Sequence, residues 1–92
     1  MTIIAAKINI DNKCDHISLI NDIAVNKFNA KSAHEVNTNV FNIDDGLNDV
    51  RAYFDVSNRG ITFICRYAKD IPSVKQRIEE FVANSASIKI TL

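Results

Sequence analysis

Several residue types are scarce in this sequence, and each scarcity excludes a class of protein. The 92 residues include two Gly and one Pro, so the chain has neither a flexible linker nor a low-complexity segment. No apolar run approaches the ~20 residues that a membrane-spanning helix needs. Eleven basic residues balance eleven acidic ones, and this zero net charge lacks the excess of Lys and Arg that is typical of general nucleic-acid binders.

Cysteine usage and the first residues indicate where the protein acts. Cys14 and Cys65 fall in different predicted elements, at a spacing that matches no disulfide framework, which is typical of reduced thiols in the cytosol. Residues 1–7 lack the basic segment and the long apolar segment of a secretory signal peptide. We therefore expect a cytoplasmic location.

Hydrophobic periodicity predicts six elements in one domain that spans residues 1–92. In chain order they are a strand over 2–10, a helix that Asp15 caps and that ends near Phe28, strands over 50–56 and 61–67, a helix over 70–84, and a strand over 86–92. This order predicts an α+β fold of ferredoxin-like βαββαβ layout. Because each strand has one apolar face, both helices should cover one face of an antiparallel sheet of four or five strands.

Alternation within the strands and helical stripes assigns side chains to the core and to solvent. The core should contain Ile8, Ile20, Phe54, Phe63, Ile78, Phe81 and Ile90. The uncovered face of the sheet should carry Lys7, Asn9, Arg51, Tyr53, Asp55, Thr62, Ile64, Arg66, Ser87, Lys89 and Thr91. We also expect Ile4 and Ile17 on buried sides of their elements, and Gly60 at the positive φ of the hairpin turn.

Residues 30–46 fit three interpretations, which the sequence leaves open. Ser32 and Glu35 have the spacing of a capping box, which is typical of a helical turn. The apolar run at 40–43 is also compatible with an extra edge strand. The third interpretation is a loop.

Three protein families that share this layout have motifs with which the chain can be compared. Residues 59–64 loosely resemble the RNP1 strand of the RNA-recognition motif, which would stack bases on Ile61 and Phe63, although alternation places both in the core. Acylphosphatases bind phosphate in the loop after the first strand, but residues 11–14 contain neither Arg nor Gly. Heavy-metal-associated domains would need a Cys-x-x-Cys motif there, which is missing. An RNA- or DNA-binding domain and a small acylphosphatase-like hydrolase remain the alternative functions.

Catalytic and metal-binding constellations are also missing from the pattern. Cys14 and His16 have the spacing of a zinc ligand pair, but a structural zinc site needs four ligands. Residues 42–49 are acidic and depart from the EF-hand pattern, and no Ser lies in a nucleophile motif. We therefore expect no metal, no cofactor and no catalytic residue.

By elimination, the sequence favours a non-enzymatic protein-binding module. In size, Asn-rich composition and single-domain character it resembles the small inhibitor proteins of phages and mobile elements, anti-CRISPR proteins among them. This resemblance implies a stoichiometric inhibitor that sterically blocks a host protein or ribonucleoprotein complex, without membrane contact and without strong nucleic-acid binding of its own. Because Tyr and Arg dominate interface energetics, we expect the partner to meet Phe41, Arg51, Tyr53, Asp55, Asn58, Arg59 and Arg66.

Overall fold

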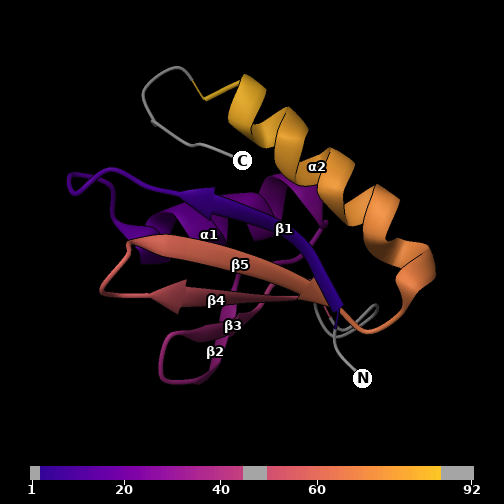
Figure 1. Ribbon diagram of the computed structural model, residues 1–92, viewed down its shortest axis with the longest axis horizontal. Helices are drawn as coiled ribbons and strands as arrows, with labels where there is room; N and C mark the ends of the chain where they lie inside the picture. The colour runs from indigo at the N-terminus through magenta and orange to yellow at the C-terminus, as the bar shows by residue number, and fades with distance from the viewer. Residues whose placement is uncertain (1–2, 45–49, 86–92) are drawn as a thin grey trace.

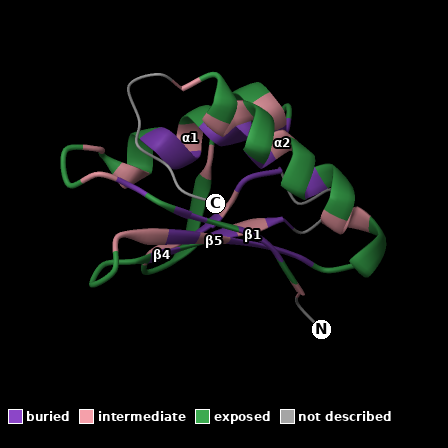
Figure 2. Ribbon diagram, turned by 45° about the horizontal axis from the view of Figure 1, so that its top comes forward, coloured by how far each residue is buried: buried purple, intermediate pink, exposed green. Residues whose placement is uncertain are grey.

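The computed structural model describes residues 3–44 and 50–85, which form an α+β fold as predicted. Its elements are β1 (Ile3–Asn9), α1 (His16–Lys27), β2 (His34–Asn37), β3 (Val40–Asn42), β4 (Arg51–Asp55), β5 (Gly60–Cys65), the 3-10 turn η1 (Ala68–Asp70) and α2 (Ile71–Ala83). The strands form one antiparallel sheet of five strands in the order β1-β5-β4-β3-β2. Both helices lie on the same face of this sheet (Figures 1 and 2).

The strand order is consistent with the predicted ferredoxin-like arrangement. β1 and β4 each pair antiparallel with β5, so they run parallel to each other with β5 between them. This is the split βαβ arrangement. The hairpin of β2 and β3 extends the sheet beyond β4, and the predicted strand over 86–92, which includes Ile90, lies outside the described residues.

Local signals at both ends of α1 explain where the helix begins and ends. Asp15 is the N-cap, with Oδ1 accepting from the Ile17 amide at 3.2 Å and Oδ2 accepting from the Ser18 hydroxyl at 2.9 Å. Asn29 follows the helix in the left-handed region, at φ 55°. The prediction for this helix is therefore confirmed at both ends.

The buried face of α1 differs from the predicted stripe at its first turn. Leu19, Ile20, Ile23 and Ala24 are buried, whereas Ile17 is 55% exposed. The first turn of the buried face belongs to His16, whose ring stacks on Phe54 with centroids 3.8 Å apart. Because successive residues are turned by ~100° around a helix, a face that starts at His16 leaves Ile17 at its margin.

A β-bulge in β1 changes which side chains of that strand are exposed. Ile4 pairs with Ile64 and Ala6 pairs with Phe63, so Ala5 is an extra residue between the two pairs. Both alanines are buried, and Ile4 is 54% exposed on the face away from the helices. The prediction that Ile4 is buried is therefore wrong.

The hairpin of β4 and β5 has the predicted facing. Ala52 and Phe54 of β4 and Ile61, Phe63 and Cys65 of β5 are buried. The positive φ of the turn belongs to Arg59, at 49°, and Gly60 instead begins β5 opposite Asn9 and Asp55. The prediction for Gly60 is wrong because the residue with a left-handed backbone in the loop 56–59 is Arg59, one position before Gly60.

The Asp55 side chain organises this loop. Its Oδ1 accepts from the Ser57 amide at 3.0 Å and from the Ser57 hydroxyl at 2.8 Å, and its Oδ2 accepts from Asn58 Nδ2 at 2.9 Å. These bonds favour the ionised carboxylate and lower the pKa of Asp55, with the Ser57 hydroxyl as the largest cause. The pKa of Asp15 is also lowered, chiefly by the Ser18 hydroxyl.

We predict that acid weakens the fold through these aspartates. Because both pKa values lie lower in the folded state than the ordinary value of 3.8, their contribution is complete above that value and is lost as pH falls through the folded-state pKa. Urea denaturation at about pH 7 and about pH 3 should show a smaller acid-induced loss in the double variant Asp15→Asn, Asp55→Asn than in the wild type. An equal loss in both proteins would contradict this origin.

Residues 30–44 contain two strands, β2 and β3, so the interpretations as a helical turn and as a loop are excluded for this segment. The extra strand predicted at 40–43 is β3, but it is not an edge strand, because β2 lies outside it in the sheet. His34 and Glu35 lie in β2, and Asn39 makes the turn to β3 at φ 59°. The Ala33 amide donates to Asn21 Oδ1 at 2.9 Å, which fixes the entry to β2. Burial of the alternate residues Phe41 and Ile43 against the helices then favours strand over helix.

The second helix and the core complete the fold. α2 begins with Pro72 in its first turn, ends at the C-cap Asn84, and buries Val74 and Ile78. Of the predicted core residues, five are buried, Phe81 is half-buried and Ile90 lies outside the described residues; the five are Ile8, Ile20, Phe54, Phe63 and Ile78. Among the described residues, no helix has the length and apolar character needed to cross a membrane.

Candidate functional site

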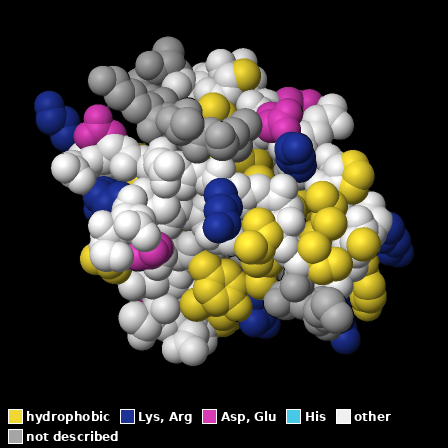
Figure 3. Space-filling model, viewed as in Figure 1, with side chains coloured by type: hydrophobic (Ala, Val, Ile, Leu, Met, Phe, Trp, Pro, Cys, Tyr) yellow, Lys and Arg dark blue, Asp and Glu magenta, His cyan; other side chains and the backbone are white. Residues whose placement is uncertain are grey.

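The candidate site is the face of the sheet that no helix covers, here called the open face. It is built by side chains that alternate with core residues along the strands and that line up across strand pairs. These residues are Ile4, Lys7, Asn9, Val40, Asn42, Arg51, Tyr53, Asp55, Thr62 and Ile64. Figure 3 shows this face, with hydrophobic side chains gathered around a single Lys or Arg side chain near its centre.

Apolar side chains cluster on the open face. Ile4 is 54% exposed and pairs with Ile64, and Tyr53 is 39% exposed and pairs with Val40. Ile4 reaches this face because of the bulge in β1. Exposed apolar side chains that gather on one face mark interaction sites, and Tyr is among the residue types enriched in protein–protein interfaces.

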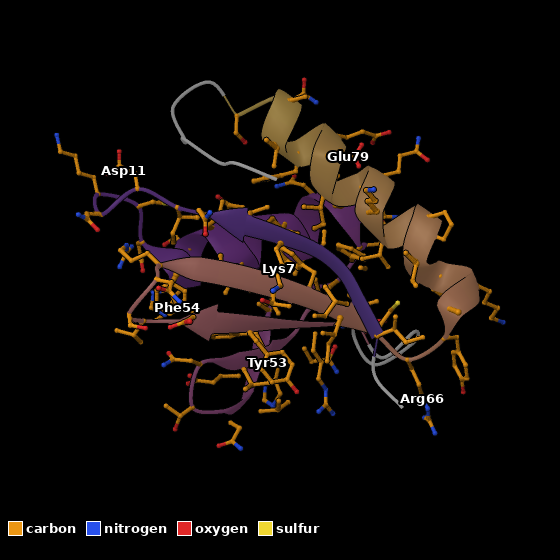
Figure 4. All side chains as sticks on the ribbon, viewed as in Figure 1. Lys7, Asp11, Tyr53, Phe54, Arg66 and Glu79 are labelled. Carbon is orange, nitrogen blue, oxygen red and sulfur yellow. The ribbon has the colours of Figure 1, made fainter. Side chains whose placement is uncertain are left out.

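Two cations flank this apolar cluster. Lys7 lies across Thr62 from Tyr53, and Arg51 lies beside Ile64 on the neighbouring strand. In Figure 4 the side chain of Lys7 lies over the middle of the open face, and that of Tyr53 extends from β4 toward β3. Within residues 3–44 and 50–85, neither cation has a hydrogen-bond or salt-bridge partner. Both charges are therefore available to a partner.

A hollow lies on the open face beside Gly60. Its volume is about 150 Å³, and its lining includes Lys7, Asn9, Asp55, Asn58 and Thr62. The hollow exists because Gly60 has no side chain at a position where the sheet directs one to this face. Lys7 and Asp55 stand on the two strands that flank β5, so opposite charges border the hollow.

Five of the predicted partner-binding residues are near or on this surface. Arg51, Tyr53 and Asp55 lie on the open face, and Asn58 is exposed in the adjoining hairpin loop. Arg66 follows β5 and is exposed, with its guanidinium 5.6 Å from the centroid of the Tyr67 ring. Arg51, Tyr53 and Asp55 therefore share one face of β4, whereas Arg66 lies beyond the end of β5.

The prediction that Phe41 and Arg59 belong to the binding surface is wrong. Phe41 is 4% exposed on the helix side, where it pairs with Ala52 and contacts His16 edge-on at 6.2 Å between ring centroids. Arg59 Nη2 donates to the carbonyls of Cys14 at 2.6 Å and Asp11 at 3.2 Å. Its guanidinium also lies 5.5 Å from the centroid of the Phe54 ring. Both side chains stabilise the fold and are not free to bind a partner.

Most contributors to the open face were missing from the predicted binding residues, and three of them show why. Alternation indicated that Lys7 faces solvent, and this signal was sufficient to include it. Gly60 was interpreted as a turn residue, and its place in β5 follows from a loop conformation that the sequence does not fix. Ile4 depends on a bulge for which the sequence contains no signal.

The positions of these side chains also test RNA binding, phosphate binding and metal binding. Ile61 and Phe63 are each 0% exposed, so RNP1-type stacking of bases on these two side chains has no accessible surface. In the loop after β1, the amides of Lys13 and Cys14 donate to Asp11 at 3.0 Å each, so they are not directed at a phosphate. In the described part of the chain, no three His, Cys, Asp or Glu side chains come together as a metal site.

The cysteines are free thiols with limited access to solvent. Cys65 is buried and Cys14 is half-buried. Burial raises the pKa of both thiols; for Cys14 this effect exceeds the opposing effect of the Arg59 charge. Because the thiolate is the reactive form, neither site favours nucleophilic chemistry.

Comparisons of the chain with protein-family models, with curated proteins and with solved structures found no match.

Proposed function

We propose that this protein is a non-enzymatic binding module that meets a protein partner through the open face of its sheet. The observation that carries the proposal is that exposed Ile4 and Tyr53 share the face that neither helix covers with two cations, Lys7 and Arg51, that have no partner among the described residues. An apolar and aromatic centre bordered by charge is the composition of protein interfaces. The two cations favour a partner with an acidic patch next to an apolar contact area.

A protein partner fits this face better than a nucleic acid does. Nucleic-acid affinity comes mostly from several Lys and Arg side chains that neutralise phosphates. Among the described residues of the open face, Lys7 and Arg51 are the cations, and they share the face with Ile4, Tyr53 and Ile64. Ile4 and Tyr53 are the exposed ones, and removing their apolar surface from water favours binding to a partner with an apolar contact area.

The finer proposal is a stoichiometric inhibitor of a host protein or ribonucleoprotein complex, as in the anti-CRISPR proteins that the chain resembles in size and character. Such a protein acts by occluding a nucleic-acid path or a subunit contact. A small rigid sheet with one uncovered face suits this mode of action because it binds without ordering a flexible segment first. We place the protein in the cytoplasm, where free thiols such as Cys14 and Cys65 stay reduced.

A photo-crosslinking experiment tests the proposed face. The crosslinking amino acid p-benzoylphenylalanine replaces Tyr53 on the open face in one variant and Val25 on α1 in a matched control, because these side chains are 39% and 41% exposed. Irradiation in lysate of the source cell should give a discrete adduct with a single partner from position 53 and none from position 25. An adduct from position 25 alone would place the binding surface on the helices.

A further inference from the structure

The hollow beside Gly60 has opposite charges on its two sides. Lys7 of β1 pairs with Thr62, and Asp55 of β4 pairs with Gly60, so the ammonium and the carboxylate approach the hollow from opposite flanks of β5. These two groups form no salt bridge with each other within the described residues. A group that enters the hollow therefore meets a cation on one side and an anion on the other.

The polar atoms around the hollow retain free hydrogen-bonding capacity. Asp55 Oδ1 already accepts from Ser57, but Oδ2 accepts only from Asn58 Nδ2 among the described residues, although a carboxylate oxygen can accept more than one bond. The Lys7 ammonium is a donor without a partner in the same part of the chain. The hollow thus offers a donor on the β1 side and an acceptor on the β4 side.

We propose that this hollow binds an amide group, with the amide oxygen accepting from Lys7 and the amide N–H donating to Asp55. An amide is neutral and dipolar, so it satisfies both flanks, whereas a carboxylate is repelled by Asp55 and an ammonium is repelled by Lys7. The absence of a side chain at Gly60 permits the close approach. In the complex the amide belongs to the partner, either an Asn or Gln side chain or its main chain, so the biological role of the hollow rests on the proposed function.

Small probes test the hollow without the partner. Propionamide and N-methylacetamide are isomers that represent a side-chain carboxamide and a main-chain amide, and propionate and propylammonium are their charged counterparts. In a titration followed by amide NMR of the 15N-labelled protein, we expect saturable shifts of Gly60 and Asn9 with a Kd of about 10 mM for an amide probe. Both charged probes should bind at least ~3-fold more weakly, because each meets a like charge. Tighter binding of propionamide would indicate a side-chain carboxamide, and tighter binding of N-methylacetamide would indicate a main-chain group.

Gly60→Ala is the matched variant, because it adds one methyl group at the hollow. A Cβ at this position would lie 3.2 Å from Asn9 Oδ1, at the end of an exposed side chain that can move, and 3.6 Å from the Ile8 carbonyl oxygen. We expect this variant to remain folded and to lose at least ~5-fold in amide affinity. Lys7→Met removes the donor without filling the hollow and should weaken the amide probes similarly.

Three results would overturn the proposal: no saturable shift with either amide, tighter binding of propionate or propylammonium, or unchanged amide affinity in both variants. Because the probes are tested on the isolated protein, these results would leave partner binding by Ile4, Tyr53 and Arg51 standing. Conversely, failure of the crosslinking experiment would not alter the measured preference of the hollow for an amide.

Discussion

Replacing Phe63 with Ala should lower the free energy of unfolding by about 3–5 kcal/mol. Phe63 is 0% exposed in the middle of β5, with Ala6 on one side and Ala52 on the other. Its two cross-strand neighbours are small, so neither can fill the space that a truncated ring leaves. The cavity therefore persists, and its cost adds to the lost burial of the ring.

Urea denaturation of the wild type and the variant measures this effect. Tyr53→Ala, on the opposite face of the sheet, is the control and should change the free energy of unfolding by less than ~1 kcal/mol. If Phe63→Ala does not fold, Phe63→Leu retains most of the volume and should cost about 1 kcal/mol. A Phe63→Ala variant that loses less than ~1 kcal/mol would mean that β5 presents this ring to solvent, in the orientation of an RNA-binding strand.

Replacing Arg59 with Ala should lower the free energy of unfolding by about 2 kcal/mol, which is typical for the loss of a charged hydrogen-bond donor to partly buried carbonyls. Its guanidinium joins the β4–β5 loop to the carbonyls of Cys14 and Asp11 and lies over the ring of Phe54. The variant leaves these two carbonyls without this donor and removes the cover of the ring. The loop after β1 and the hairpin should therefore loosen together.

Arg51→Ala is the matched control for Arg59→Ala. Arg51 has no hydrogen-bond or salt-bridge partner among the described residues, so its loss should change stability by less than ~0.5 kcal/mol. The sequence placed both arginines on one binding surface, whereas the structure assigns Arg59 to the fold and leaves Arg51 available. Equal stability of the two variants would contradict this division.

Elements with a strong local signal could be predicted from the sequence. The alternation in β4 and β5 fixes which face of each strand is buried, and Asp15 and Asn29 mark the ends of α1. The errors concern features that depend on contacts distant in sequence. The bulge that exposes Ile4 depends on the register between β1 and β5, and the pairing of β2 with β3 depends on burial of Phe41 under α1.

The candidate site was also predictable only where its residues follow from a local signal. Alternation alone directs Arg51, Tyr53 and Asp55 to one face. It gives no information about Arg59, because the left-handed backbone of that residue accompanies a side chain bonded to the loop after β1. The hollow was not predictable either, since it requires Gly60 to lie within β5 between Asn9 and Asp55.

The central claim is that the open face binds a protein, and titration calorimetry with the crosslinked partner, once purified, tests it most directly. The face variant combines Lys7→Glu, Arg51→Glu and Tyr53→Ala. Its control outside the open face combines Lys13→Glu in the loop after β1 with Lys75→Glu and Val25→Ala on the helices, which makes the same change in charge at exposed positions. We predict at least ~30-fold weaker binding by the face variant and wild-type affinity for the control, with both melting curves close to the wild type. Unchanged affinity of the face variant, or a loss confined to the control, would contradict the account.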